Sequence, residues 1–248
     1  MSNPAHIRTI FKREFKSYFN SPVAYVFLVA FLVLIGFLTF GVTMFYERRQ
    51  ADLTPFFFWH PWVYLLLIPA STMGLWAEER RTGTIELLLT LPVTLVEALV
   101  GKFLAAWAFI GIALALTFPV VLTTLWLGSP DMGAVIGGYF GSLLLSGACV
   151  AIGIFASALS RSQVISFVIA LAICLFMLII GFDPVINSVA KRGIPSAIVD
   201  GLAACSLMQH FDSMRRGVID FYDISYYAGV VIFMLSAAHF VTESRKAS

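Results

Sequence analysis

Charged residues are scarce in this chain of 248 residues, in which only 12% of the side chains are Asp, Glu, Lys or Arg and 60% are apolar. A globular soluble domain carries about a quarter charged residues. The mean hydropathy of +0.91 is high, in agreement with the large share of apolar residues. The formal net charge of +2 is too small to suggest nucleic acid as a partner. The composition therefore predicts an integral membrane protein with several spans.

Signatures of catalysis and of nucleotide binding are also missing. The chain has no GxxxxGK[ST] phosphate loop, no HExxH metal motif and no GxSxG elbow. We therefore expect no catalytic residue, no metal and no cofactor here, and ATP and Mg would have to be bound by a partner chain. The cysteines lack CxxC spacing and the histidines are scattered, which argues against a redox or metal site: Cys149, Cys174, Cys205, His6, His60, His210 and His239.

Six segments are long and apolar enough to cross a membrane, which takes about 20 residues. Helices are the expected form, because unpaired backbone groups are costly in lipid. We expect an all-α integral membrane protein with six transmembrane helices in a single domain, 1–248. The expected spans are about Val23–Met44, Phe57–Trp76, Val100–Trp126, Ala134–Leu159, Val164–Phe182 and Ile224–Val241.

The distribution of Lys and Arg predicts the orientation. An even number of spans places both termini on one side, and with the N-terminus inside, ten cations are cytoplasmic and six are outside. This bias predicts two cytoplasmic termini. The inner set is Arg8, Lys12, Arg13, Lys16, Arg80, Arg81, Lys102, Arg161, Arg245 and Lys246, and the outer set is Arg48, Arg49, Lys191, Arg192, Arg215 and Arg216.

The first twenty residues have two faces at helical spacing. One face is apolar (Ile7, Phe11, Phe15, Tyr18) and the other is basic (Arg8, Lys12, Lys16). This pattern predicts an N-terminal amphipathic helix in the membrane interface. The alternative is a solvated tail.

A charged island separates the second and third spans. Glu79, Arg80 and Arg81 end the second span, and Gly83 allows a sharp turn. The following residues predict a short surface helix that ends at a proline, with a glutamate in its first turn and leucines that can bury: Thr84, Glu86, Leu87, Leu88 and Pro92. A plain hydrophilic loop is the alternative.

The stretch from Glu79 to Pro92 resembles the loop between spans two and three of ABC-2 type transporter permeases, and the order of elements is similar over the whole chain. The resemblance implies that this loop is a coupling helix that binds an ABC ATP-binding subunit, present in two copies. It also implies a second permease chain, either identical or related, and a bacterial inner membrane. The segment from Gln209 to Asp220 looks like that of the gliding-motility-type branch.

The connection from Asp183 to Asp223 is too long and too apolar for an idle loop. Its short apolar runs cannot span the bilayer, so we expect short extracytoplasmic helices that cap the outer end of the path. They would contact a second subunit or a periplasmic partner, with simple anchoring to headgroups as the alternative. The candidate contact residues are His210, Phe211, Arg215, Arg216, Gly217 and Asp220.

Within the spans, two further features bear on packing. Pro69 and Pro119 are expected to kink their helices. Gly133, Gly137 and Gly141 recur on one helical face and predict a close-packing surface within the subunit.

Together these patterns favour the permease subunit of an ATP-driven exporter. A mechanotransmitter that acts on a periplasmic partner is the first alternative. An intramembrane enzyme is the second, and it is disfavoured because Lys102 and His239, near the ends of their spans, are nearly the only ionisable groups in the apolar segments.

Overall fold

The computed structural model describes residues 4–43, 45–47, 51–83, 93–182, 184–186 and 201–244. Within these ranges the regular elements are all helical, which confirms the predicted all-α class. The elements are α1 (Pro4–Asn20), α2 (Pro22–Gly36), the π-helix η1 (Phe37–Val42), α3 (Thr54–Thr72), α4 (Gly74–Arg81), α6 (Leu95–Ala115), α7 (Phe118–Leu127), α8 (Met132–Leu159), α9 (Gln163–Ile179), α12 (Leu207–Arg215) and α13 (Phe221–Ser244).

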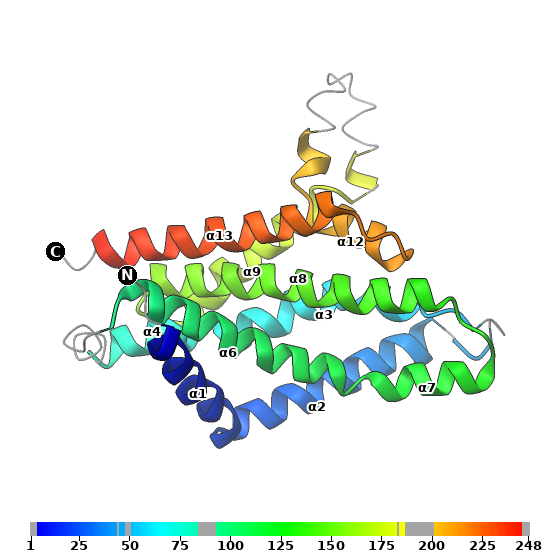
Figure 1. Cartoon of the computed structure of the whole chain (residues 1–248), viewed down its shortest axis with the longest axis horizontal. Coiled ribbons are helices and arrows are strands. Elements are labelled where there is room, and N and C mark those ends of the chain that lie inside the picture. Colours follow the sequence, from blue (N-terminus) through cyan, green and yellow to red (C-terminus); the bar gives the residue numbers. More distant parts are fainter. Residues whose placement is uncertain are drawn as a thin grey trace.

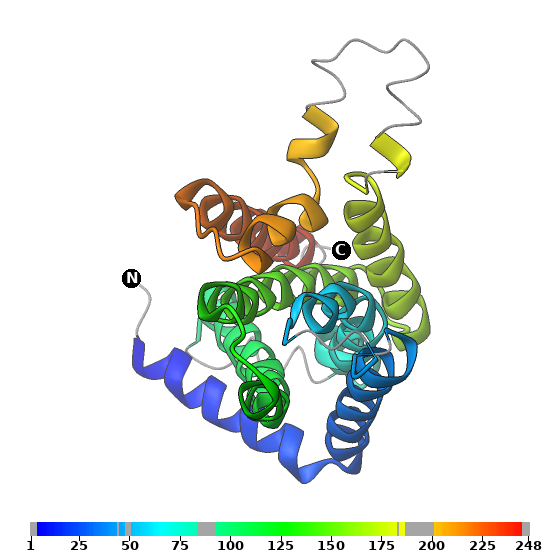
Figure 2. The same ribbon diagram turned by 90° about the vertical axis from the view of Figure 1, so that its right-hand side faces the viewer.

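The long helices lie side by side around α8 (Figure 1). Viewed along the bundle, α8 has neighbours on several sides (Figure 2), and it contacts α3, α6, α9, α12 and α13. Most of its 28 residues are Gly, Ala, Ser or aliphatic, so that neighbouring helices can approach its backbone closely. The small residues thus make α8 the central helix.

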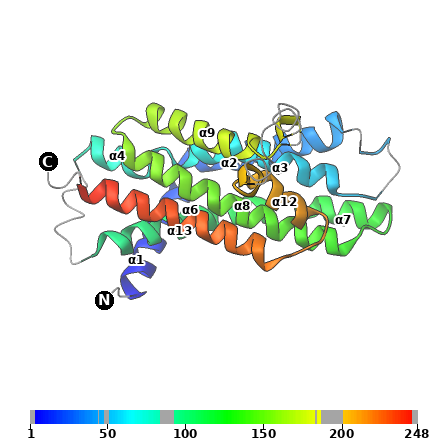
Figure 3. The same ribbon diagram turned by 90° about the horizontal axis from the view of Figure 1, so that it is seen from above.

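Four described helices are long and apolar enough to cross a membrane: Pro22–Val42, Leu95–Leu127, Met132–Leu159 and Phe221–Ser244. The other two expected spans also fold as helices, α3 and α9. The α9 helix has only 17 residues, and α3 contains three prolines and His60, which lower its hydropathy. Both termini of the described chain lie at the same end of the bundle as α4 (Figure 3).

Of the two prolines that are expected to kink their helices, Pro119 lies at a break, whereas Pro69 lies inside the continuous helix α3. Pro119 has no N–H to donate to the carbonyl of Ala115, and the helix is interrupted at Leu116 and Thr117. The chain then restarts as α7 with Pro119 in its first turn, where the missing donor is harmless. Downstream of Pro69, Met73 separates α3 from α4.

The expected amphipathic helix is α1, and its faces are those that the spacing predicts. Ile10 is buried, Phe11 and Phe15 are half-buried, and Lys12 and Lys16 are exposed. The helix packs on α6 at Gly101, where an added Cβ would lie 2.7 Å from Cγ2 of Ile10. Part of the apolar face therefore packs against protein.

The glycine face of α8 packs against the last turn of α12 and the turn that follows it. An added Cβ at Gly141 would lie 2.8 Å from Cβ of Met214, and one at Gly137 would overlap the Met214 carbonyl. Gly217, with φ of 86°, lies against the same surface. The face is therefore a packing surface within one chain, as predicted, and Gly133 takes part through its backbone, since an added Cβ at Gly217 would lie 3.0 Å from the Gly133 carbonyl carbon.

Candidate functional site

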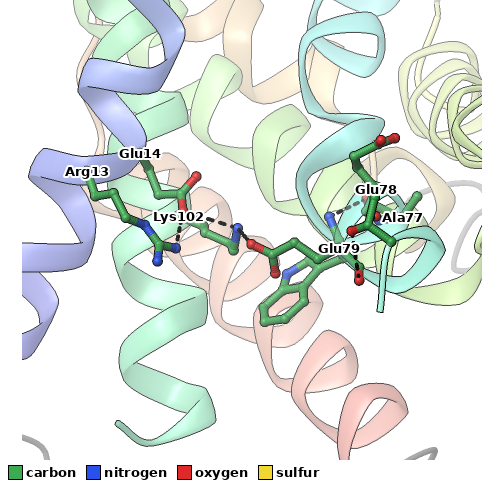
Figure 4. A network of polar contacts seen from close by, with 9 residues as sticks. Arg13, Glu14, Ala77, Glu78, Glu79 and Lys102 are labelled. Atoms are coloured by element: carbon green, nitrogen blue, oxygen red, sulfur yellow. Dashed lines mark hydrogen bonds and ion pairs between the residues drawn. The ribbon is translucent and has the colours of Figure 1, made fainter. Parts of the chain in front are cut away.

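Ionic contacts join three helices at the end of the bundle that holds α4. Lys102 of α6 donates to Glu79 of α4 at 2.7 Å and to Glu14 of α1 at 3.4 Å (Figure 4). Arg13 contacts Glu14 at 2.6 Å from the solvent side. We call Lys102, Glu14 and Glu79 the Lys102 network.

Lys102 is charged and nearly inaccessible, with 2% of its side chain exposed. An ammonium group is stable in such a place only when it is paired, and two carboxylates meet it here. The Trp76 ring adds a cation–π contact, with Nζ of Lys102 5.3 Å from the ring centroid. The network thus joins the end of α4 to the start of α6 and the middle of α1.

The carboxyl of Glu14 reflects this environment. Burial alone would raise its pKa, but Lys102 and Arg13 lower it by more, so the pKa lies below the ordinary value of 4.5. Glu14 is therefore ionised at neutral pH and binds Lys102 as a carboxylate.

Glu78 extends the contacts to α9. It pairs with Arg81 one turn later and accepts a hydrogen bond from the Gln163 amide in the first turn of α9. The hydrogen bond from Arg81 lowers the pKa of Glu78, and the same contact raises the pKa of Arg81. Four helices, α1, α4, α6 and α9, are thus connected through polar side chains.

A serine of α8 satisfies the backbone where α3 ends and α4 begins. The hydroxyl of Ser157 accepts from the backbone N–H groups of Trp76 (2.9 Å) and Ala77 (3.0 Å) and donates to the Met73 carbonyl (2.9 Å). Backbone groups freed by the break are thereby paired inside the bundle. Figure 4 shows Ala77 directly beside Glu78 and Glu79.

The start of α6 is fixed by a capping box. The Thr94 hydroxyl accepts from the N–H of Glu97, and the Glu97 carboxylate accepts from the N–H of Thr94. The same carboxylate lies 3.3 Å from His6 of α1. Both α4, which leads into residues 84–92, and α6, which follows them, are therefore tied to α1.

The expected coupling residues divide between described and undescribed ranges. Glu79, Arg80 and Arg81 form the last turn of α4. Gly83 has φ of 73°, which confirms the expected left-handed turn. Thr84, Glu86, Leu87, Leu88 and Pro92 lie outside the described residues.

The expected outer contact residues are partly in the core. Phe211 is fully buried and His210 is 4% exposed, with Nδ1 2.6 Å from Oδ1 of Asp223 in α13. His210 also stacks on Tyr226 at 3.9 Å between ring centroids. Among the other candidates, Arg216 and Asp220 are exposed, Gly217 turns the chain after α12, and Arg215 pairs with Asp212.

Comparison with known families gives one match. The family model described as ABC-2 family transporter protein matches residues 60–238, which include every described helix from α4 to α12. The chain belongs to this family. A search of curated proteins finds no match.

Membership in the ABC-2 family has direct consequences for this chain. Permeases of the family are membrane subunits, generally without catalytic activity, that work with an ATP-binding subunit. The match carries no information on the gliding-motility-type branch, which stays a prediction.

The sequence alone does not predict the central place of Lys102 in this permease. Lys102 is one of several inner cations near the end of a predicted span, and Glu14 belongs to neither predicted face of α1. The available signal was a lone lysine eight residues after Thr94, within an apolar segment. A charge at such a place requires a partner, but nothing in the local sequence names Glu14 or Glu79.

Proposed function

We propose that this chain is the permease subunit of an ATP-driven ABC exporter in a bacterial inner membrane. Two ATP-binding subunits would bind at the α4 end, and two permease chains would enclose one path. The observation that carries this proposal is the Lys102 network, because it joins α4 and α6, the two helices that flank residues 84–92. Movement imposed on that segment would act on both helices together.

The breaks in the helices suggest how such movement reaches the membrane. Met73 separates α4 from α3, and Leu116 and Thr117 separate α6 from α7. The segments nearest the ATP-binding subunit could therefore tilt relative to the outer segments. Glu14 and Gln163 would carry the same displacement to α1 and α9.

The second candidate function is that of a mechanotransmitter. The exposed apolar side chains in the outer segment beside α12 support it. Residues 201–204 stand away from the side of the bundle in Figure 1, and Val218, Ile219, Phe221 and Tyr222 are exposed apolar side chains beside α12. Such a surface could bind a second subunit or a periplasmic partner. Crosslinking from cysteines at Arg216 and Asp220, both exposed, would identify what lies there.

The coupling assignment is tested by copurification with the ATP-binding subunit. Glu86→Lys should weaken the complex about tenfold or more, because it reverses a charge at the proposed interface. Glu47→Lys, at an exposed position at the opposite end of the bundle, is the matched control. Equal yields of complex from both variants would remove residues 84–92 from the interface.

Gly83 gives an independent test of the same segment. Among the described residues, no atom lies within 4 Å of an added Cβ at Gly83, so the positive φ is the restriction on substitution that the described structure shows. Gly83→Val should reduce ATP hydrolysis by the complex, whereas Gly83→Asn should keep it, because asparagine tolerates the left-handed region. If valine and asparagine behave alike, the turn is not required for coupling.

A further inference from the structure

A groove beside the Lys102 network combines a charged end with an apolar wall. It has a volume of about 640 Å³ and is lined by residues of α1, α2, α3, α4, α6 and α9. This volume lies within the range of about 300–1,000 Å³ for small-molecule sites. We call it the α2–α3 groove.

The charged end of the groove has more carboxylates than cations. Glu14, Glu78 and Glu79 line it, together with the single ammonium of Lys102. Two guanidinium groups contact these carboxylates without lining the groove: Arg13 pairs with Glu14, and Arg81 pairs with Glu78. The three carboxylates are thus balanced by three cations in and beside the groove, and such a mixed site is complementary to a zwitterionic head that carries an amino group next to a phosphate.

The wall of the groove is aliphatic and faces outward. Val23 and Val26 of α2 are 69% and 67% exposed, and Ala30 continues the same side of the helix. Leu67 and Ala70 of α3 form the opposite wall. In a helix long and apolar enough to span a membrane, exposed valines of this kind contact hydrocarbon chains.

We propose that the α2–α3 groove binds a membrane phospholipid with a primary ammonium head, such as phosphatidylethanolamine. Its ammonium group donates to Glu14 and Glu79, its phosphate lies beside Arg13, which contacts Glu14, and an acyl chain follows the aliphatic wall. This site goes beyond the proposed function, since it needs neither ATP nor the ATP-binding subunit. Because the same carboxylates hold Lys102 and the end of α4, lipid in the groove acts directly on the proposed coupling end.

The proposal is tested by native mass spectrometry of the full-length chain in mild detergent. Phosphatidylethanolamine and phosphatidylglycerol with identical acyl chains are titrated separately. The ammonium lipid should bind about tenfold more tightly, the size of effect expected from charge-assisted hydrogen bonds to carboxylates. Phosphatidylcholine, which cannot donate these bonds, should bind more weakly as well.

Two kinds of variant locate the site. Glu14→Gln should remove most of the preference for phosphatidylethanolamine, whereas Glu243→Gln, exposed on α13, should keep it. Ala70→Trp should obstruct the half-buried wall and reduce binding of the lipid, with Ala228→Trp on the exposed side of α13 as its control. Ala30→Phe tests the same wall from α2 if Ala70→Trp fails to fold.

Three results would overturn the proposal: equal binding of the two lipids, a preference that survives both Glu14→Gln and the wall variants, or binding of free ethanolamine as tight as that of the lipid. Copurification of the ATP-binding subunit is measured on the same variants. If the lipid preference is absent but the ATP-binding subunit still copurifies, the lipid site is refuted and the coupling assignment stands. If the subunit fails to copurify but the lipid preference is present, the lipid site stands and the coupling assignment is refuted.

Discussion

Lys102 places a positive charge where the surrounding composition is apolar, and its contacts explain why it can remain there. Glu79 and Glu14 neutralise the ammonium, and Trp76 covers it. A buried ion pair contributes little net stability compared with an apolar replacement of both partners, but removal of one partner leaves the other unpaired. The network is therefore intolerant of single changes.

The first prediction follows from this asymmetry. Lys102→Ala should lower the free energy of unfolding by about 3 kcal/mol, since it removes the buried cation that Glu14 and Glu79 both contact and leaves the space of its side chain unfilled. Arg161→Ala, at an exposed position, should change it by less than about 0.5 kcal/mol. Denaturant-induced unfolding in detergent micelles measures both. Equal effects of the two substitutions would contradict the described burial of Lys102.

The second prediction concerns pH and Glu14. Because its pKa is lowered in the folded state, Glu14 contributes stability that is fully present above the ordinary value of 4.5 and is lost as pH falls through the lower folded value. The melting temperature should therefore fall below about pH 4.5, and Glu14→Gln should show a smaller fall. Thermal scans from pH 3 to pH 7 make the comparison; identical slopes for the two proteins would exclude this carboxyl as the cause.

At the scale of the helices, α8 determines how closely its neighbours approach. At Gly153 an added Cβ would overlap the Thr72 side chain, at Gly138 it would lie 2.5 Å from the Phe57 ring, and at Gly147 it would lie 3.1 Å from Nε1 of Trp107. Glycines on different sides of one helix thus admit α3, α6 and the turn after α12. This explains how a helix with weak intrinsic propensity can serve as the centre of the bundle.

The third prediction compares two glycine substitutions that should have different effects on the stability of the fold. Gly137→Ala should destabilise the chain and loosen α12, because the new methyl group meets the rigid Met214 carbonyl. Gly229→Ala, with no atom within 4 Å of an added Cβ, should be neutral or stabilising by up to about 1 kcal/mol. Thermal stability and proteolysis after Arg216 report the two effects. If Gly137→Ala changes neither the thermal stability nor the rate of cleavage after Arg216, α12 does not pack against Gly137.

The sequence predicted the individual helices better than their connections. Hydropathy and period located α1, α2, α8 and α13 because lipid and water act on every residue locally, and Pro119 marked a break through its own missing N–H. The partners of Lys102 were beyond such reasoning, since they lie 88 and 23 residues away. Nothing in the glycine spacing of α8 specified Met214 as the residue that would lie against it, or the burial of Phe211.

At the scale of the whole chain, the ends of the bundle define two surfaces. The α4 helix, both described termini and the end of α8 that Arg161 follows lie toward one end, and the start of α8, which Asp131 precedes, lies at the other (Figure 1). If the N-terminus is cytoplasmic, as the distribution of Lys and Arg predicts, only the second end is open to reagents outside the cell.

The fourth prediction is that Asp131→Cys is labelled by an impermeant thiol reagent in intact cells and Arg161→Cys is not. Cys205 is exposed and is replaced by serine beforehand, whereas Cys149 and Cys174 are buried. Labelling of Arg161→Cys after the membrane is opened serves as the control for accessibility. The opposite pattern would place the α4 end outside, away from ATP.

The unequal helices have a consequence for the membrane itself. On one side, α9 has 17 residues, which correspond to about 26 Å, and its Val164, Val168 and Phe176 are exposed. On another side, Leu95–Leu127 has 33 residues, more than the hydrocarbon core of about 30 Å requires. We therefore expect a bilayer that tapers around the protein and is thinner beside α9. Such elastic distortion costs a fraction of a kcal/mol per Å of mismatch, and it is relieved when two thin edges meet. The shape of each chain thus favours lateral attraction through the α9 side, driven by the lipids and not by any contact between residues.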